Sequence, residues 1–372
     1  DHARACPGNT PHMLPQRHIN RHRGFALPGA VVRGQAGCAR KHRLRYLAAI
    51  GLGSSAIVRA HLRWWRRKIV AEDASILVAD YAPLAIWAAQ GLKAEGWEIE
   101  ILSVGTGYGL PPARMTRFPQ LLPDYTHQTT TEAALLAVLN TVAQEEGLPA
   151  LPHLPALARA DREMAFTLPH LDPYAKARAG DERFAPVLAP LSPLADDRGD
   201  ELFVYFSRGE LGDPELVAAL ADLPLPRRGF LPGASAATLD RLRGSGMVVE
   251  AAPLTMAEIA ARSRLVLGSG QHGLQCLAAL AGLPQVAVPQ HLEQLFHCRR
   301  SEARGLLRHA PFDRRDRQQI TALILEACED RSLHLLARDL AEALRADYPA
   351  DPLARLTEQL APLVDRARRA WR

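Results

Sequence analysis

The chain has 372 residues, 48% of them hydrophobic, and this length suggests two domains of ordinary size. Its five cysteines are scattered, odd in number and without metal-like spacing, which favours a reducing, cytoplasmic location over a disulfide framework. No apolar run approaches the ~18 residues that a membrane-spanning helix needs, and no signal peptide is visible at the start. We therefore expect a globular protein without a transmembrane segment, for which peripheral membrane contact stays open.

The net charge of +5 is distributed unevenly along the chain. Residues 1–45 hold nine Lys or Arg side chains and a single acid, Asp1, so the rest of the chain is mildly acidic. This segment shows no helical or strand periodicity, and we expect it to be disordered or non-native, for instance from a shifted reading frame. A basic arm for nucleic acid or membrane is the alternative. A basic tail on an acidic body argues against a nucleic-acid partner.

From about residue 46 the pattern becomes that of an α/β protein. The sequence predicts a helix over 55–69, a strand over 76–80, a helix to about 92, a strand over 99–104 and a helix over 129–146. Asp80 falls at the carboxyl end of its strand, the edge where open α/β sheets bind ligands. It is a candidate to assist a catalytic base or to orient an acceptor; it could equally cap a nearby helix.

Residues 174–200 are rich in Pro, Asp, Gly and Arg, and they are predicted to link two domains. The strand at 201–206 then opens a second domain, with Ser207 at its carboxyl end. Alternating strands and helices follow, among them helices expected at 296–305, 317–328, 333–346 and 352–371. Pro362 lies inside the last of these and is expected to kink or split it.

The most informative stretch runs from residue 265 to residue 294. It reads as a buried strand, a turn containing Gly268, Gly270 and Gly273, an amphipathic helix ended by Gly282 and Pro284, and a second strand over 285–288. Such a βαβ unit leaves free N–H groups and the positive end of a helix dipole at the turn. The turn therefore favours a phosphate.

This stretch resembles the donor-binding motif of nucleotide-sugar-dependent glycosyltransferases of the two-Rossmann (GT-B) type, the bacterial natural-product and UDP-glucuronosyltransferase-like group. Ser269 stands at the family's leading His, Gln271 at its second Gly and Leu274 at its Thr. The Gly-Leu-Pro that ends at Pro284 matches the family's Gly-Val-Pro. Glu293 and Gln294 match its acidic-Gln pair.

The resemblance implies that residues 269–273 cradle a donor diphosphate and that Glu293 and Gln294 bind hydroxyls of the donor sugar. The implied donor-binding set is Ser207, Gly268, Ser269, Gly270, Gln271, His272, Gly273, Glu293 and Gln294. The family's first strand and its Gly-rich loop, which carries a His that commonly acts as general base, have no match. The catalytic base therefore stays unassigned, with Asp80 as the single candidate.

The implied fold is α/β with two Rossmann-like domains, of which the N-terminal one is incomplete. The expected parts are the segment 1–45, a partial acceptor-side domain at 46–173, the linker 174–200, a nucleotide-sugar domain at 201–346 and, packing back on the N-terminal domain, a helix at 347–372.

The implied activity is that of a UDP-sugar-dependent hexosyltransferase acting on a small hydroxylated or lipid acceptor by metal-independent inversion. No cofactor is expected, and no Asp-x-Asp cluster for a metal occurs. Two alternatives remain: a catalytically inactive relative that binds nucleotide-sugar or a partner, and a nucleotide-sugar epimerase. The base of the donor stays open because the family's base-stacking Trp is absent at 252–254, and the sequence also leaves the sugar and the acceptor open.

Overall fold

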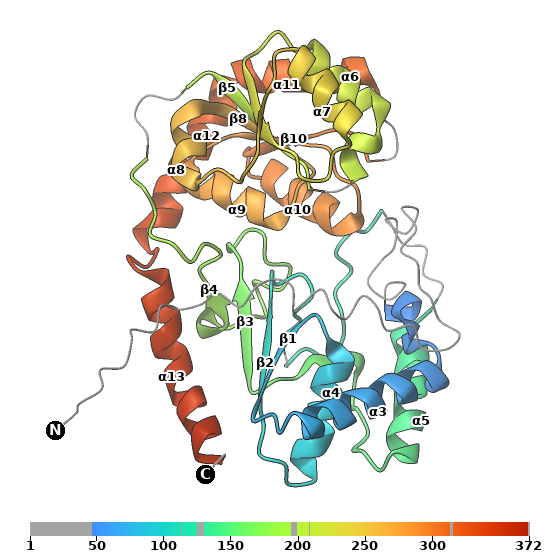
Figure 1. Ribbon diagram of the computed structural model, residues 1–372. Coiled ribbons are helices and arrows are strands. Elements are labelled where there is room, and N and C mark those ends of the chain that lie inside the picture. The colour runs from blue at the N-terminus through green and yellow to red at the C-terminus, as the bar shows by residue number, and fades with distance from the viewer. Residues whose placement is uncertain are drawn as a thin grey trace, which may run out of the picture. The chain divides into compact units, whose positions relative to one another are not determined.

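The computed structural model describes residues 47–112, 114–124, 130–194, 199–207, 209–312 and 315–370. The basic segment expected at 1–45 lies outside these residues. Two separate parallel sheets organise the described part of the chain (Figure 1). Each sheet belongs to one lobe, and we call these the N-terminal and C-terminal lobes.

The N-terminal sheet has four parallel strands in the order of the sequence. Its strands are β1 (Ile76–Asp80), β2 (Glu100–Gly105), β3 (Arg162–Phe166) and β4 (Arg183–Phe184). In the register of the first pair, Asp80 lies opposite Val104. Strand β1 forms one edge of the sheet, because no other described strand pairs with its outer side. Asp80 lies at the carboxyl end of this edge strand.

Helices α3 (Ser55–Ala71), α4 (Pro83–Ala94) and α5 (Glu132–Glu145) share one apolar core on a single face of this sheet. Local chemistry starts each of them: the Ser54 and Thr131 side chains accept hydrogen bonds from the first turns of α3 and α5, and Pro83 begins α4. Helix α13 (Pro352–Ala370) covers part of the opposite face (Figure 1). Short turns of helix complete the lobe: η3 (Ala48–Leu52), η4 (Leu154–Ala158) and η5 (Gly180–Glu182).

The C-terminal sheet has six parallel strands in the order β10-β9-β8-β5-β6-β7. They are β5 (Glu201–Tyr205), β6 (Arg227–Phe230), β7 (Val248–Glu250), β8 (Ser263–Gly268), β9 (Gln285–Ala287) and β10 (Leu307–His309). The chain winds from β5 to β7 in one direction and from β8 to β10 in the other. The direction therefore reverses between β5 and β8, and such a switch point opens a crevice at the carboxyl ends of the strands.

Helices cover both faces of this sheet. On one face α6 (Pro214–Asp222), α7 (Ala236–Gly244) and α11 (Arg317–Glu329) contribute to the larger core. On the other, α8 (Met256–Arg262) and α9 (His272–Ala281) pack on β5 and β8. The remaining elements are η6 (Gly209–Gly212), α10 (Leu292–Glu302) and α12 (Arg331–Ala346). Strand β8 is wholly buried along 265–268, as a central parallel strand should be.

Most elements confirm the sequence-based expectations, and four details differ. Helix α10 begins at Leu292 rather than at residue 296, and β10 was not anticipated. The expected linker contributes a strand, because β4 pairs with β3. Helix α13 continues through Pro362 as a single helix. None of the helices within the described ranges has the length and apolarity that crossing a bilayer would require.

Candidate functional site

The turn between β8 and α9 lies at the switch point of the C-terminal sheet, and two of its glycines, Gly268 and Gly270, are sterically required. Gly270 has φ +79°, and a Cβ there would collide with Sγ of Cys298. A Cβ on Gly268 would collide with the side chain of Leu274 and lie 2.8 Å from Oε1 of Gln271. The backbone therefore approaches its neighbours more closely than any other residue type would allow.

Ser269 is fully buried and stands at the centre of a side-chain network. Its hydroxyl donates to Glu210 Oε1 (3.1 Å) and accepts from Gln294 Nε2 (3.0 Å). Gln294 in turn accepts from the backbone N–H of Gln290 (2.8 Å). The sequence predicts direct donor ligands at Ser269 and Gln294, but these groups are already paired with protein atoms. In this arrangement both buried side chains stabilise the turn through hydrogen bonds to protein atoms.

The carboxamide of Gln271 folds back over the start of the turn. Its Oε1 accepts from the backbone N–H of Ser269 at 2.9 Å, and its Nε2 lies 3.5 Å from the carbonyl oxygen of Tyr205. That side chain therefore occupies one of the amides predicted to hold a diphosphate. The following four backbone N–H groups, from residue 270 to residue 273, have no hydrogen-bond acceptor among the described residues. They are the free donors expected at a helix N-terminus.

Gly273 is the open position of the turn. It is exposed, and a Cβ there would meet no atom within 4 Å. The interior side of the same helical turn is fixed instead by Gln275, which donates to the carbonyl oxygen of Gly270 (3.1 Å) and accepts from the Ser301 hydroxyl (2.6 Å). The site thus combines a rigid backbone with free N–H groups beside open space.

His272, a predicted donor-binding residue, is buried and faces the N-terminal lobe. Its Nε2 lies 2.8 Å from Thr167 Oγ1 in a hydrogen bond, and its ring centroid is 5.2 Å from that of His297. Burial lowers the pKa of His272 to about 4 and likewise that of His170 to about 4, and it lowers the pKa of His297 well below its usual value. All three imidazoles are therefore neutral at pH 7. The side chain of His272 joins the lobes, while its backbone N–H belongs to the turn.

Two further predicted donor contacts, Glu293 and Ser207, come from the first turn of α10 and the end of β5. Glu293 Oε1 accepts a hydrogen bond from Thr106 Oγ1 (3.4 Å), a residue of the loop after β2. Ser207 is half-buried, just beyond the end of β5. Both stay proposed donor contacts, and Glu293 also touches the acceptor-side lobe.

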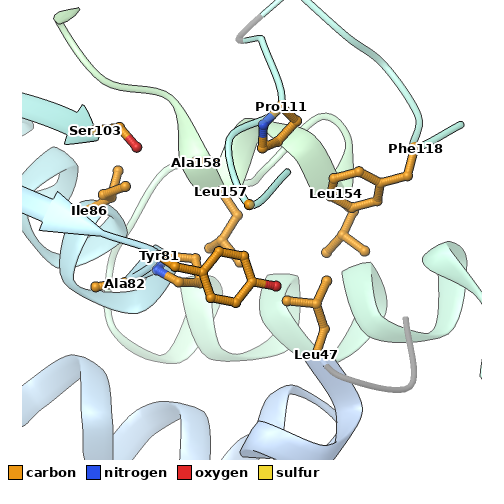
Figure 2. A pocket seen from close by; sticks show the side chains of 12 residues that line it. Leu47, Tyr81, Ala82, Ile86, Ser103, Pro111, Phe118, Leu154, Leu157 and Ala158 are labelled. Atoms are coloured by element: carbon orange, nitrogen blue, oxygen red, sulfur yellow. The ribbon is translucent and has the colours of Figure 1, made fainter. Parts of the chain in front are cut away.

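On the N-terminal lobe, a small cavity of about 30 Å³ lies at the carboxyl end of β1. Its walls are largely apolar, and Figure 2 shows the Tyr81 ring among them, with its hydroxyl end on the side of Leu47. Tyr81 has φ +47°, a backbone conformation uncommon for residues other than glycine. Held strain of this kind is frequent at functional sites. Tyr81, which lines the cavity, directly follows Asp80 in the chain.

Asp80 itself lies at the exposed end of the edge strand. Its Oδ1 is within 3.4 Å of where a Cβ on Gly105 would stand, so a glycine there leaves room for the carboxylate. Partial burial of the carboxyl raises the pKa of Asp80 above its ordinary value. A raised pKa makes a carboxylate a better proton acceptor.

Several residues of the site were not found from the sequence. Glu210 is 59 positions from Ser269, and Thr167 is 105 positions from His272. No local pattern links such distant partners; the positive φ of Tyr81 is also invisible in the sequence. Among the described residues, no group of three or more His, Cys, Asp or Glu side chains is placed to hold a metal ion.

The two sheets, the switch point and the glycine turn define an α/β protein with two Rossmann-like domains of the GT-B kind. The sequence matches no family model and no curated protein. The fold is nevertheless similar, over most of the chain, to solved natural-product GT-B glycosyltransferases.

Three of these structures illustrate the likeness. The calicheamicin glycosyltransferase CalG4 is 18% identical, with a TM-score of 0.63 over 93% of this chain and 85% of that one. The spinosyn rhamnosyltransferase SpnG, complexed with thymidine diphosphate, is 19% identical, with a TM-score of 0.61 over 87% and 84%. The glycosyltransferase of kitacinnamycin is 16% identical, with a TM-score of 0.57 over 86% and 83%. At these identities the likeness shows the fold.

Proposed function

We propose that this protein transfers a hexose from a nucleotide-diphospho-sugar to a hydroxyl acceptor, with inversion at the anomeric carbon. The observation that carries the proposal is the row of free backbone N–H groups at residues 270–273, beside exposed Gly273 and at the switch point between β5 and β8. Backbone N–H groups and the positive end of the α9 dipole favour a diphosphate at this place.

The chemical step needs three contributions. The acceptor oxygen attacks the anomeric carbon, the carbon–oxygen bond to the diphosphate breaks, and the diphosphate leaves with the bonding electrons. The N–H groups of residues 270–273 stabilise the charge that develops on the leaving group. Asp80 takes the proton of the acceptor hydroxyl, and its raised pKa suits this role.

In this proposal the acceptor hydroxyl lies near Asp80 at the carboxyl end of β1, beside the cavity next to Tyr81. That cavity, of about 30 Å³, has room for a group about the size of one water and not for the body of an acceptor. Glu293 and Ser207 contact the donor, while Ser269 and Gln294 hold the turn through their buried network. The Gln271 carboxamide swings off the Ser269 N–H when the diphosphate arrives.

A second candidate is a protein that binds nucleotide-sugar without turning it over. The pairing of Ser269, Gln294 and the Ser269 amide with protein atoms favours it, because three groups expected to contact the donor are occupied. The two candidates share donor binding and differ in catalysis.

One experiment separates them. The purified chain is titrated calorimetrically with UDP-glucose and with TDP-glucose, since SpnG was solved with thymidine diphosphate, and release of the nucleoside diphosphate is followed with and without hydroxylated aromatic acceptors. Acceptor-dependent release supports the transferase, and binding without release supports the second candidate. Absence of binding by nucleotide-sugars of every base would contradict both.

A further inference from the structure

A second cavity, larger than the one beside Tyr81, lies on the α13 side of the molecule. Its volume is about 420 Å³, within the range of about 300–1,000 Å³ typical of small-molecule sites. Three parts of the chain form its walls: the loop after β3, the segment around β4, and the junction of α12 with α13. No residue of the 268–273 turn and no residue around Asp80 lines it; it borders the site described above through Thr167, whose hydroxyl hydrogen-bonds His272.

Two guanidinium groups give this cavity a positive character. Arg183 has a buried Nε without a hydrogen-bond partner among the described residues, and its Nη2 is 3.7 Å from Asp172, which already pairs with Arg178 at 2.8 Å. Arg355, exposed on α13, makes no ion pair within the described part of the chain. Asp347 is the single acidic residue of the lining. The lining therefore carries a net positive charge.

The rest of the lining is apolar and held in place. Phe184, Leu188 and Leu356 contribute, and Leu188 leaves 40% of its surface exposed. The Tyr348 hydroxyl donates to the carbonyl oxygen of Val187 (2.7 Å) and accepts from its N–H (3.2 Å), which fixes the segment after β4 against the end of α12. Burial raises the pKa of Tyr348 to about 12, so this clamp keeps its proton over the physiological range. The cavity is therefore preformed.

We propose that this cavity binds an amphipathic organic monoanion: an acid group held by Arg183 and Arg355, on an aromatic or alkyl body lying against Phe184, Leu188 and Leu356. Charge and shape agree in this assignment. An ionised acid group pairs with the guanidinium groups of Arg183 and Arg355 and offsets the excess positive charge, and an apolar body covers the exposed surface of Leu188. The proposal is independent of sugar transfer, because it uses none of the groups of the donor turn.

The test compares two probes that share one ring system. 1-Anilinonaphthalene-8-sulfonate carries a sulfonate, and N-phenyl-1-naphthylamine lacks it; the fluorescence of both rises on transfer to an apolar site. We expect saturable binding of the anionic probe at one site per chain. Arg355→Gln should weaken it about tenfold, as expected for loss of a hydrogen bond to a charged group, while the neutral probe keeps its affinity.

Matched variants and a competitor complete the design. Arg368→Gln removes an exposed arginine of the same helix that does not line the cavity, and it should leave both probes unaffected. Leu188→Ser should weaken both probes, because it removes apolar wall. Saturating UDP should leave the anionic probe bound. Equal affinity of wild type and Arg355→Gln, equal weakening by Arg368→Gln, or displacement of the probe by UDP would overturn the assignment.

Discussion

The two sheets of this molecule differ in how completely they are enclosed. In the C-terminal lobe, Val266 of β8 is 0% exposed, between paired strands and beneath helices on both faces. In the N-terminal lobe, Val78 at the middle of β1 is 61% exposed, and no described strand pairs with its outer side. Parallel sheets are normally buried on both faces. The enclosed lobe therefore holds its turn rigidly, whereas the open lobe carries its candidate acceptor groups on an uncovered edge.

The position of α3 bears on this open edge. Helix α3 leads into β1 on the face that α4 and α5 also cover. Because strand–helix–strand crossovers between parallel strands are right-handed, a strand that precedes α3 would pair with the free side of β1.

The largest expected effect concerns the chemistry assigned to the open lobe. Asp80→Asn removes the proposed proton acceptor with little change in volume, so transfer should fall about 10²- to 10⁴-fold, while the calorimetric affinity for the nucleotide-sugar stays unchanged. In the wild type, the transfer rate should rise with pH as Asp80 ionises. The midpoint of this rise should lie above the ordinary pKa of an aspartate carboxyl, because the pKa of Asp80 is raised. Full activity in the variant would remove Asp80 from the mechanism.

Next in size is the rigidity of the enclosed turn. Gly270→Ala forces a side chain into a positive-φ position and against Cys298, and should lower the free energy of unfolding by about 3 kcal/mol. Gly273→Ala, three residues on, meets open space and should change stability by no more than about 1 kcal/mol, in the stabilising direction. Denaturant unfolding of both variants checks the contrast; equal effects would show that the turn is not held as described.

A third effect belongs to the boundary between the lobes. His297 is 0% exposed, and neither ring nitrogen has a partner among the described residues. Burial lowers the pKa of His297 in the folded chain. Below about pH 6.5 the unfolded chain therefore binds a proton at this residue that the folded chain does not, and the free energy of unfolding decreases as the pH is lowered. His297→Leu should remove about 2 kcal/mol of the stability lost between pH 7 and pH 5. If the free energy of unfolding falls by the same amount in both proteins between pH 7 and pH 5, this account of His297 is contradicted.

The smallest contrast compares one substitution in the two sheets. Val266→Thr buries a hydroxyl in β8 and should cost about 1–3 kcal/mol, whereas Val78→Thr on exposed β1 should stay within about 0.5 kcal/mol. Thermal unfolding measures both. A large cost at Val78 would mean that the edge of β1 is covered in solution.

Much of the fold could be predicted from the sequence because its signals are local. Glycines, prolines and apolar periodicity mark the β8–α9 unit within about twenty residues, and the structure confirms its strand, turn and helix. The short strands β4 and β10 were missed because two or three residues carry no recognisable pattern. The start of α10 was placed too late because Glu293 and Gln294 were read as a binding motif rather than as helix.

The side-chain arrangement of the site could not be predicted in the same way. Ser269 and Gln294 were placed by their motif positions, but which way they point depends on Glu210 and Gln290, and Glu210 comes from a distant part of the chain. The neutral histidines at 170, 272 and 297 likewise meet only through tertiary packing. The roles of these residues toward a donor stay predictions.

The most direct measurement is nucleotide binding to a pair of variants at residue 273. Gly273→Asp and Gly273→Asn place side chains of nearly equal size in open space, and differ in charge; Gly270 would not serve, because any Cβ there meets Cys298. A carboxylate in the first turn of α9 favours the helix itself but repels a diphosphate. We expect Gly273→Asp to bind UDP or TDP at least tenfold more weakly than Gly273→Asn in calorimetric titration. Equal affinities in the two variants would contradict diphosphate binding at this turn.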